Sequence, residues 1–258
     1  MNSELQGLHA VVTGGGSGIG AAVARELAQR GARVTLMGRD LARLEAQRER
    51  LAALGELAVE RCDVADEASV KTAFESAQSE LGPLDILVNN AGQAQTAPFV
   101  KTSLAQWQQM LQVNLTGTFL CTQQVVAGMA ERGFGRIINV ASTASLKGYA
   151  YVSAYCAAKH GVLGLTRALA LEMAKQGVTV NAVCPGYTET EIVEQAVANI
   201  VAKTGRTAEA ARQQLAAGNP QGRLVQPEEV AHTVAWLSSR GASAITGQAI
   251  AVCGGEWS

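Results

Sequence analysis

The chain has 258 residues, of which 48% are hydrophobic and 17% are charged, with 21 basic and 22 acidic side chains. This near-neutral balance argues against a broad electrostatic surface for nucleic acid or an anionic membrane, and no apolar run approaches the roughly 18 residues that span a bilayer. We therefore expect neither a nucleic-acid nor a membrane partner, and the length allows one large α/β domain.

Short apolar runs alternate with segments of helical period, which is the pattern of repeated βα units and a parallel sheet. Strands are predicted at residues 10–13, 33–37, 57–62, 86–89, 136–141, 179–183 and 249–252. Helices are predicted at residues 18–30, 41–54, 67–81, 104–131, 152–175 and 227–238. Because no linker, repeat or change of composition divides the sequence, we predict a single domain over residues 1–258. Its fold class would be α/β: a Rossmann-like, doubly wound parallel sheet of about seven strands flanked by helices.

A glycine-rich turn, TGGGSGIG at residues 13–20, follows the first strand and opens the first helix. Glycines let the backbone turn tightly and approach a pyrophosphate, whose charge is then met by amides at the helix N-terminus. A glycine run alone can also be a flexible turn, and the first gap here is one residue longer than in the generic fingerprint. Its position between strand and helix favours dinucleotide binding. The candidate residues are Gly14, Gly16, Ser17, Gly18, Ile19 and Gly20.

Tyr155 and Lys159 are four residues apart on a predicted helix and would therefore share one face. A cation beside a phenol favours the phenolate and lowers the pKa of the phenol, which can then act as a general acid or base. Taken alone, the spacing fits an ordinary amphipathic helix equally well. Ser142 lies thirteen residues before the tyrosine, just after a predicted strand.

Residues 187–225 form the one irregular region, which is polar and rich in alanine and follows the end of a strand. Open α/β sheets bind ligands beyond the carboxyl ends of their strands. We therefore expect the segment at about 187–225 to overhang the site as a substrate lid.

The five cysteines are odd in number, widely spaced and without a metal-ligand pattern. We expect them to be buried free thiols in a reducing compartment. The N-terminal sequence has no basic region before its apolar stretch and does not resemble a signal peptide. These features predict a cytoplasmic protein, and the three scattered histidines argue against a metal site.

The motifs together resemble the short-chain dehydrogenase/reductase family. The matching elements occur in order over nearly the whole chain: TGGGSGIG at 13–20, CDV at 62–64, NNAG at 89–92, Asn114, Ser142, Tyr155, Lys159, and PG at 185–186. Within the family, the nearest likeness is to actinorhodin-type polyketide ketoreductases and 3-oxoacyl/3-hydroxyacyl oxidoreductases. It rests on TVNAVCPG at 179–186, GRLVQPEEVA at 222–231 and VCGG at 252–255.

The resemblance implies catalytic roles for four residues. Tyr155 would protonate a ketone oxygen as hydride arrives, or act as the base in the oxidative direction. Lys159 would lower the pKa of Tyr155 and hydrogen-bond the nicotinamide ribose. Ser142 would donate a hydrogen bond to the substrate oxygen, and Asn114 would help hold a water that supplies protons.

The resemblance also implies cofactor contacts at the ends of other strands. Asp63 and Val64 would bind adenine, and the backbone of Asn90, Ala91 and Gly92 would pass close to the ribose and phosphates. The remaining candidates, which would bind the nicotinamide carboxamide, are Pro185, Gly186, Thr188 and Thr190.

The end of the second strand favours NADP(H) over NAD(H). Folds that use NAD place a carboxylate there for the ribose, whereas an arginine accommodates the 2′-phosphate of NADP. The acid position is Gly38 here, and Arg39 follows it. NAD(H) stays possible because Asp40 could be the ribose ligand in a shifted register. In addition, Ser17 stands where NADP-using relatives often carry a second basic residue.

The residues expected to contact substrate, Ser142, Tyr149, Tyr155 and Tyr187, are neutral and suit a ketone or secondary alcohol. We predict an NADP(H)-dependent oxidoreductase that reduces a ketone or a 3-oxoacyl-type substrate. One alternative is an NAD-dependent 3-hydroxyacyl or hydroxybutyrate-type alcohol dehydrogenase. Another is a redox-sensing dinucleotide-binding protein, against which the presence of both Tyr155 and Lys159 argues. By resemblance, we expect a homotetramer formed through the helices at 104–131 and 152–175 and the C-terminal strand.

Overall fold

The computed structural model describes residues 4–257 and contains one seven-stranded parallel sheet in the order β3-β2-β1-β4-β5-β6-β7. The order reverses direction at β1, which lies between β2 and β4, so the carboxyl ends of β1 and β4 meet at a topological switch point. The strands are β1 (His9–Thr13), β2 (Arg33–Gly38), β3 (Leu57–Arg61), β4 (Ile86–Asn89), β5 (Gly135–Val140), β6 (Val178–Pro185) and β7 (Ala249–Val252).

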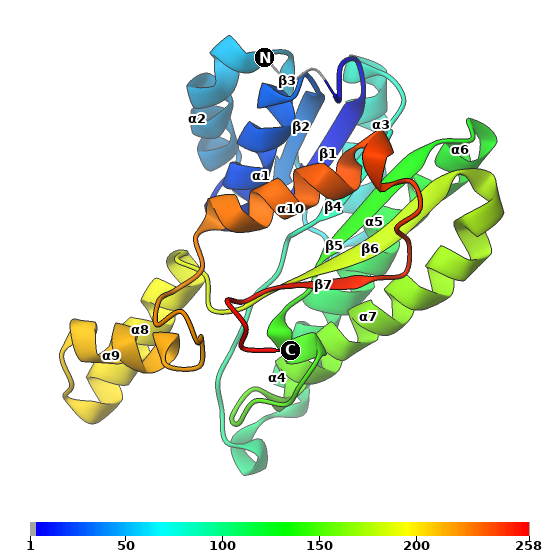
Figure 1. The fold of residues 1–258 in the computed structure, drawn as a ribbon. Coiled ribbons are helices and arrows are strands. Elements are labelled where there is room, and N and C mark those ends of the chain that lie inside the picture. The colour runs from blue at the N-terminus through cyan, green and yellow to red at the C-terminus, as the bar shows by residue number, and fades with distance from the viewer. Residues whose placement is uncertain (1–3, 258) are drawn as a thin grey trace.

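Helices cover both faces of the sheet (Figure 1). One face carries α1 (Gly18–Gln29), α2 (Leu41–Leu51) and α10 (Pro227–Ser238). The other carries α3 (Glu67–Leu81), α5 (Gly117–Gln123), α6 (Val126–Glu131) and α7 (Ser153–Met173). The prediction of a single Rossmann-like, doubly wound α/β fold is confirmed.

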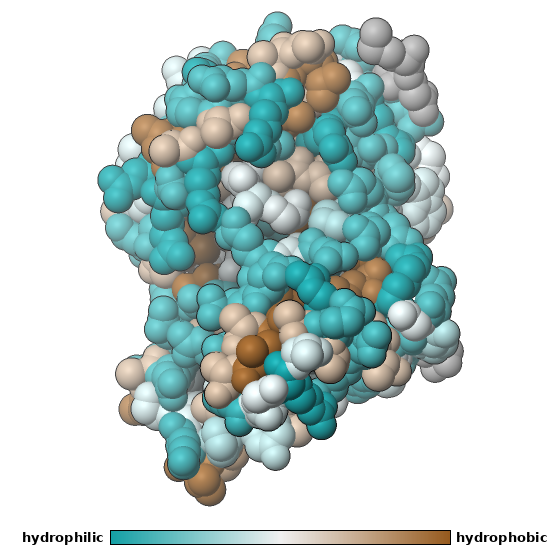
Figure 2. All heavy atoms as spheres, turned by 90° about the vertical axis from the view of Figure 1, so that its left-hand side faces the viewer, coloured by the Kyte–Doolittle hydropathy of each residue, from teal (hydrophilic) through white to brown (hydrophobic). Residues whose placement is uncertain are grey.

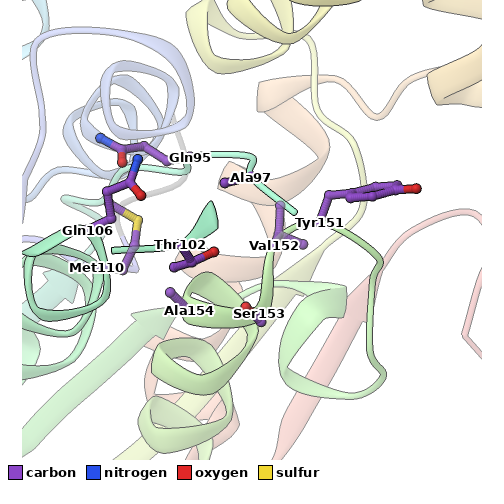
Figure 3. Close-up of a pocket in the computed structure, with 9 residues that line it drawn as sticks. All are labelled: Gln95, Ala97, Thr102, Gln106, Met110, Tyr151, Val152, Ser153 and Ala154. Carbon is purple, nitrogen blue, oxygen red and sulfur yellow. The ribbon is translucent and has the colours of Figure 1, made fainter. Parts of the chain in front are cut away.

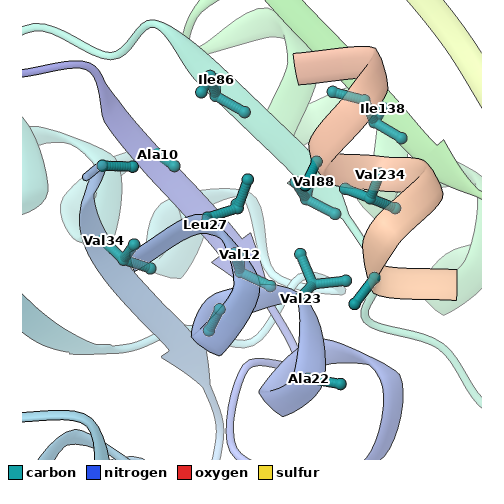
Figure 4. Close-up of a cluster of buried hydrophobic side chains, with 14 of the residues drawn as sticks. Ala10, Val12, Ala22, Val23, Leu27, Val34, Ile86, Val88, Ile138 and Val234 are labelled. Atoms are coloured by element: carbon teal, nitrogen blue, oxygen red, sulfur yellow. The ribbon is translucent and has the colours of Figure 1, made fainter. Parts of the chain in front are cut away.

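The core has two layers because the helices leave neither face of the sheet open to water. Between the sheet and the α1–α10 pair, Val12, Leu27 and Val234 have no exposed surface (Figure 4). Val11 points to the opposite face and packs in the layer that contains Phe74. This alternation explains why the strands read as continuous apolar runs rather than as alternating ones.

The single helix predicted at 104–131 is wrong, because the segment is broken into three helices. It consists of α4 (Leu104–Leu111), a π-helical turn over Gln112–Thr116, α5, and α6 after a break at residues 124–125. Side chains supply hydrogen bonds where the regular pattern is lost. The Thr118 hydroxyl donates to the Asn114 carbonyl oxygen at 3.0 Å, and the Asn114 side-chain Nδ2 donates to the carbonyl oxygen of Met110 at 3.0 Å. Such π-turns often occur at functional sites.

Residues 187–225 are not irregular, as the sequence interpretation had them. They form α8 (Glu191–Thr204) and α9 (Ala208–Ala216), which project from the body of the molecule (Figure 1). The helices enclose a small core of their own that includes Val193, Val197 and Ala211. The two ends of the segment are joined, because the Val225 amide donates to the Tyr187 carbonyl and the Glu189 amide donates to the Val225 carbonyl, each at 2.9 Å.

Within residues 4–257, none of the helices combines the length and the apolar character that a transmembrane span requires.

Candidate active site

The glycine turn between β1 and α1 has a path that side chains would block. Gly14 and Gly18 have φ angles of 67° and 52°, where residues with a side chain are strained. A Cβ atom at Gly20 would lie 2.1 Å from the carbonyl oxygen of Gly14. Ser17 occupies the N-cap of α1, yet among the described residues its side chain makes no capping hydrogen bond. The first amides of α1 are therefore available to an anion, and the turn fits a dinucleotide pyrophosphate.

The loop after β4 is fastened to this turn. The backbone amides of Asn90 and Ala91 both donate to the Thr13 hydroxyl at 3.0 Å, and the Asn90 side chain donates to the Thr13 carbonyl at 2.9 Å. Asn90 thus holds two loops together with its side chain. Ile19, on the first turn of α1, packs against the core.

The two charged residues that follow β2, Arg39 and Asp40, differ in whether another residue engages them. Asp40 is the N-cap of α2, and its carboxylate accepts from the Arg43 amide at 3.2 Å and pairs with the Arg43 guanidinium at 3.4 Å. Arg39 is exposed, and among residues 4–257 it has no ion-pair or hydrogen-bond partner. Asp40 is therefore already engaged, whereas the Arg39 guanidinium is available to a ligand.

The other predicted cofactor residues lie on neighbouring strand ends. One Asp63 carboxylate oxygen accepts from the Ala65 amide at 3.0 Å, and Val64 is buried against Gly117, where a Cβ atom would lie 2.9 Å from the valine side chain. Gly92 lies close to Asn114 and Lys159, since a Cβ atom there would be 2.8 Å from the Asn114 Oδ1 and 3.7 Å from the Lys159 Nζ.

The segment after β6 returns to the glycine turn. Pro185 ends β6, and the Gly186 amide donates to the Val252 carbonyl at 3.0 Å. The hydroxyl of Thr188 donates to the carbonyl of Gly186 at 3.0 Å. Thr190 begins α8, and a Cβ atom at Gly18 would lie 3.1 Å from its methyl carbon. Residues 172 positions apart thus face each other across the nucleotide side of the site.

Tyr155 and Lys159 lie one turn apart on α7, as predicted from their spacing. The Lys159 Nζ is 5.7 Å from the centre of the Tyr155 ring and donates to the carbonyl oxygen of Val140 at 2.8 Å. Lys159 is almost fully buried, and this burial lowers its pKa to about 8.

The pKa of Tyr155 moves in the direction opposite to the one expected. Burial raises this pKa to about 12, and hydrogen bonding from Ser142 opposes the rise only in part. The lysine does not outweigh the burial, because its ammonium is directed at the carbonyl of Val140 and lies beside the ring face. Tyr155 is consequently a neutral phenol at physiological pH.

Asn114 lies in the π-helical turn and is buried. Its Oδ1 accepts from the Gln93 amide at 3.2 Å, and its Nδ2 donates to the Gln93 carbonyl at 3.0 Å. The side chain therefore ties the loop after β4 to the crossover helices and does not face bulk solvent.

Ser142 follows β5 and begins a short 3-10 turn over Thr143–Ser145, where its Oγ accepts from the Ala144 amide at 3.1 Å. Tyr149 and Tyr187 lie edge to face, with ring centres 6.3 Å apart. The Tyr149 hydroxyl is 2.8 Å from the Thr143 hydroxyl and donates to the carboxylate of Glu256. Burial and this carboxylate raise the pKa of Tyr149.

A family model described as enoyl-(acyl carrier protein) reductase matches residues 14–256. The chain belongs to the short-chain dehydrogenase/reductase family. It is 42% identical over 252 residues to a Streptomyces coelicolor protein that bears the name of a ketoacyl reductase, with 95% of each chain covered. It is 41% identical over 248 residues to acetoacetyl-CoA reductase of Cupriavidus necator, with 95% of this chain and 96% of the relative covered. A variant of actinorhodin polyketide ketoreductase, solved with NADPH, superposes with a TM-score of 0.94 at 39% identity, and 99% of each chain is covered.

The protein is therefore a short-chain dehydrogenase/reductase, an oxidoreductase that binds a nicotinamide dinucleotide. On the side that carries α2 and the α8–α9 helices, Figure 2 shows a hollow in which pale residues are surrounded by hydrophilic ones. Within residues 4–257, no group of three or more His, Cys, Asp or Glu side chains is placed to hold a metal ion, and the five cysteines are buried and free.

A small pocket of this dehydrogenase/reductase lies beside the start of α7 (Figure 3). None of the four predicted substrate residues lines it, and Tyr151 points away from the other labelled side chains. The pocket is lined by Gln95, Ala97, Thr102, Gln106, Met110 and residues 151–154.

Sequence reasoning missed Lys147 and Glu256, which both reach the Tyr149 side of the site. Their charged groups are 3.1 Å apart, although the two residues are 109 positions apart along the chain. No local spacing pointed to either residue, because only the fold brings the segment after β7 to the loop before α7.

Proposed function

We propose that this short-chain dehydrogenase/reductase uses NADPH to reduce the ketone of a 3-oxoacyl-type substrate to a secondary alcohol. The observation that carries the proposal is the position of the Tyr155 phenol, which is hydrogen-bonded by Ser142 and whose ring centre lies 5.7 Å from the Lys159 Nζ. Burial raises the pKa of this phenol to about 12, so that it keeps its proton at neutral pH. Reduction of a ketone needs a proton donor at the carbonyl oxygen, whereas oxidation of an alcohol needs a base. The names of the ketoacyl and acetoacetyl-CoA reductase relatives support the same direction.

The bound cofactor would supply the hydride to the carbonyl carbon. Tyr155 would donate its phenolic proton to the carbonyl oxygen as negative charge develops there. Ser142 would donate a hydrogen bond to the same oxygen, which stabilises that charge. The buried Lys159 ammonium would stabilise the phenolate that remains, and Asn114 would keep the loop after β4 in place and help return a proton from solvent.

For the cofactor, we propose that Arg39 binds the 2′-phosphate of NADP(H). The free guanidinium of Arg39, the engagement of the Asp40 carboxylate by Arg43 and the absence of an acid at Gly38 support this assignment. The remaining cofactor contacts would be the predicted ones: those of the glycine turn, Asp63, Val64, residues 90–92, Pro185, Gly186, Thr188 and Thr190. Use of NAD(H) is the alternative, and it would require Asp40 to leave its helix cap.

We also propose that the α8–α9 segment at residues 187–225 is the substrate lid. Its ends are fastened together beside the site, its helices carry a separate small core, and Thr190 at its start faces Gly18. A segment built in this way can move as a unit over the substrate.

We propose that the protein forms a homotetramer and that it is located in the cytoplasm. Exposed apolar side chains on the helices predicted to form the interface support the assembly: Leu104 is 69% exposed, Phe119 43% and Leu171 81%. The free thiols support a reducing compartment. A monomeric mass by sedimentation at micromolar concentration would contradict the tetramer.

The proposed reaction is tested by following NADPH and NADH oxidation with acetoacetyl thioesters, cyclic ketones, small ketones and enoyl thioesters. We expect a 3-oxoacyl thioester with NADPH to give the highest kcat/KM. Tyr155→Phe should lower kcat by about 10²- to 10⁴-fold, because only the proton donor is lost, and NADPH affinity should be retained. Full activity of Tyr155→Phe, or a preference for enoyl thioesters, would contradict the proposal, and a preference for NAD⁺ with 3-hydroxyacyl substrates would favour the dehydrogenase alternative.

A further inference from the structure

The carboxylate of Glu256 is buried beside the substrate side of the site. The segment after β7 turns back toward the loop before α7 (Figure 1), and the Glu256 side chain keeps only 5% of its surface exposed. A buried charge is costly unless it is paired and hydrogen-bonded. Both conditions hold, because the Tyr149 hydroxyl donates to this carboxylate and the Lys147 Nζ lies 3.1 Å from it.

The same carboxylate packs against the residue that precedes the 187–225 segment and against the turn that follows α9 within it. A Cβ atom at Gly186, which precedes the segment, would lie 3.1 Å from the Glu256 Oε2, and one at Gly218, which follows α9, would lie 3.3 Å from the Oε1. Gly254, two residues earlier, is packed so closely against Asn219 that a side chain would not fit. Movement of the segment at either end would therefore disturb the surroundings of Glu256.

Tyr149 links Glu256 to residues next to the predicted catalytic residues Ser142 and Tyr155. The Tyr149 hydroxyl is 2.8 Å from that of Thr143, which directly follows Ser142. The Tyr149 ring lies edge to face with Tyr187, the first residue of the segment. The pKa of Tyr155 is raised chiefly by burial and to a smaller extent by Tyr187, which therefore lies near the phenol.

Glu256 also determines the charge of this wall. The Lys147 ammonium lies 5.1 Å from the centre of the ring of Tyr149, a predicted substrate residue, so an unpaired cation would stand beside that residue. Such a cation would attract a substrate that carries a carboxylate. Paired with Glu256, it leaves the wall electrically neutral.

We propose that Glu256 is a positioning residue that fixes Tyr149 against the 187–225 segment and cancels the charge of Lys147. The part of the site beside Tyr149 then selects an uncharged group next to the reacting ketone. The inference rests on the proposed ketone reduction at the same site. Loss of the Glu256 carboxylate should therefore loosen the packing of Tyr149 against the segment and make this part of the site more favourable to anions.

The test compares ethyl acetoacetate with acetoacetate, which present the same ketone and differ by one negative charge. In Glu256→Gln, the ratio of kcat/KM for acetoacetate to that for the ester should rise about tenfold over the parent ratio, since an ion-pair partner of the lysine is removed. In the double variant Glu256→Gln/Lys147→Met, the ratio should return close to the parent value. The matched control is Glu75→Gln, which removes the charge of one member of the exposed Lys71–Glu75 pair on α3, whose charged groups are 4.0 Å apart.

Hydrogen exchange of the same variants provides a readout that does not depend on turnover. Amides of residues 143–149, 186–190 and 218–225 should exchange faster in Glu256→Gln than in the parent enzyme, and at the parent rate in Glu75→Gln. Melting temperatures show that both variants are folded. An unchanged substrate ratio or unchanged exchange in Glu256→Gln would overturn the inference. If the parent enzyme reduces neither these two ketones nor a 3-oxoacyl thioester, the proposed function fails. Exchange alone then decides the positioning role: faster exchange in Glu256→Gln supports it, and unchanged exchange refutes it.

Discussion

Lys159 should set an alkaline limit to ketone reduction. Burial lowers its pKa to about 8, whereas burial raises the pKa of Tyr155 to about 12. As pH rises through about 8, the ammonium therefore loses its proton while the phenol keeps its own. Without the cation, the phenolate that forms during proton transfer is no longer stabilised, so kcat/KM for the ketone should fall.

The size of this fall follows from the pKa. With a value of about 8, about one tenth of Lys159 is protonated at pH ~9 and about one hundredth at pH ~10. The rate should therefore drop about tenfold and then about hundredfold relative to neutral pH. A limit set by Tyr155 alone would appear only near its own pKa of about 12.

The assay is NADPH oxidation at saturating cofactor and low ketone, from about pH 6 to about pH 10, with circular dichroism to show that the fold persists. In Lys159→Arg, any remaining activity should lack the decline, because a guanidinium keeps its charge over this range. A rate that stays constant to pH ~10 in the folded parent enzyme would refute the assignment of the cation to Lys159.

Three further outcomes are expected. Arg39→Ala should weaken NADPH binding about tenfold or more and leave NADH binding almost unchanged, because only NADPH offers a phosphate to the guanidinium; equal losses in fluorescence titrations of both cofactors would contradict this. Gly20→Ala should destabilise the fold by about 1–3 kcal/mol in urea unfolding and weaken NADPH binding, because its Cβ would lie 2.1 Å from the Gly14 carbonyl oxygen. Gly16→Ala, whose Cβ would have its nearest contact at 3.4 Å, should cause a smaller loss of stability and of binding. Burial lowers the pKa of His9, so the free energy of unfolding should fall below pH ~6.5, by at most about 1.4 kcal/mol per pH unit; His9→Gln should reduce this slope.

The parts of the fold that could be predicted are those in which residues that are close in the structure are also close along the chain. The apolar runs are long enough to identify strands buried on both faces, and the glycine turn is adjacent to β1 and α1 along the chain. Tyr155 and Lys159 share a face because the helical period places them there. Each of these inferences needs only neighbouring residues.

The sequence-based predictions fail where local features or contacts between residues far apart in the sequence determine the structure. The predicted helix at 104–131 is interrupted by the π-turn over Gln112–Thr116, where the Asn114 side chain donates to the Met110 carbonyl and, one turn later, the Thr118 hydroxyl donates to the Asn114 carbonyl. The α8–α9 helices were not recognised, since their apolar residues face a core of their own rather than the main one. Glu256 could not be found from spacing, because its contacts with Lys147 and Tyr149 join segments more than a hundred positions apart.

Tyr155 illustrates why a residue pair identified from sequence does not reveal its own protonation state. The helical spacing correctly places a lysine beside the phenol, and proximity alone would argue for a lowered pKa. The same packing that brings the two groups together also removes water from both, and this desolvation raises the pKa of Tyr155 to about 12 and lowers that of Lys159 to about 8. Burial thus leaves an acid that is protonated at neutral pH beside a cation that is close to losing its charge. In the proposed reduction, the first property supplies the proton donor, and the second should make the rate fall as the pH rises above about 8. The expected pH profile therefore depends on burial rather than on the Tyr-x-x-x-Lys spacing.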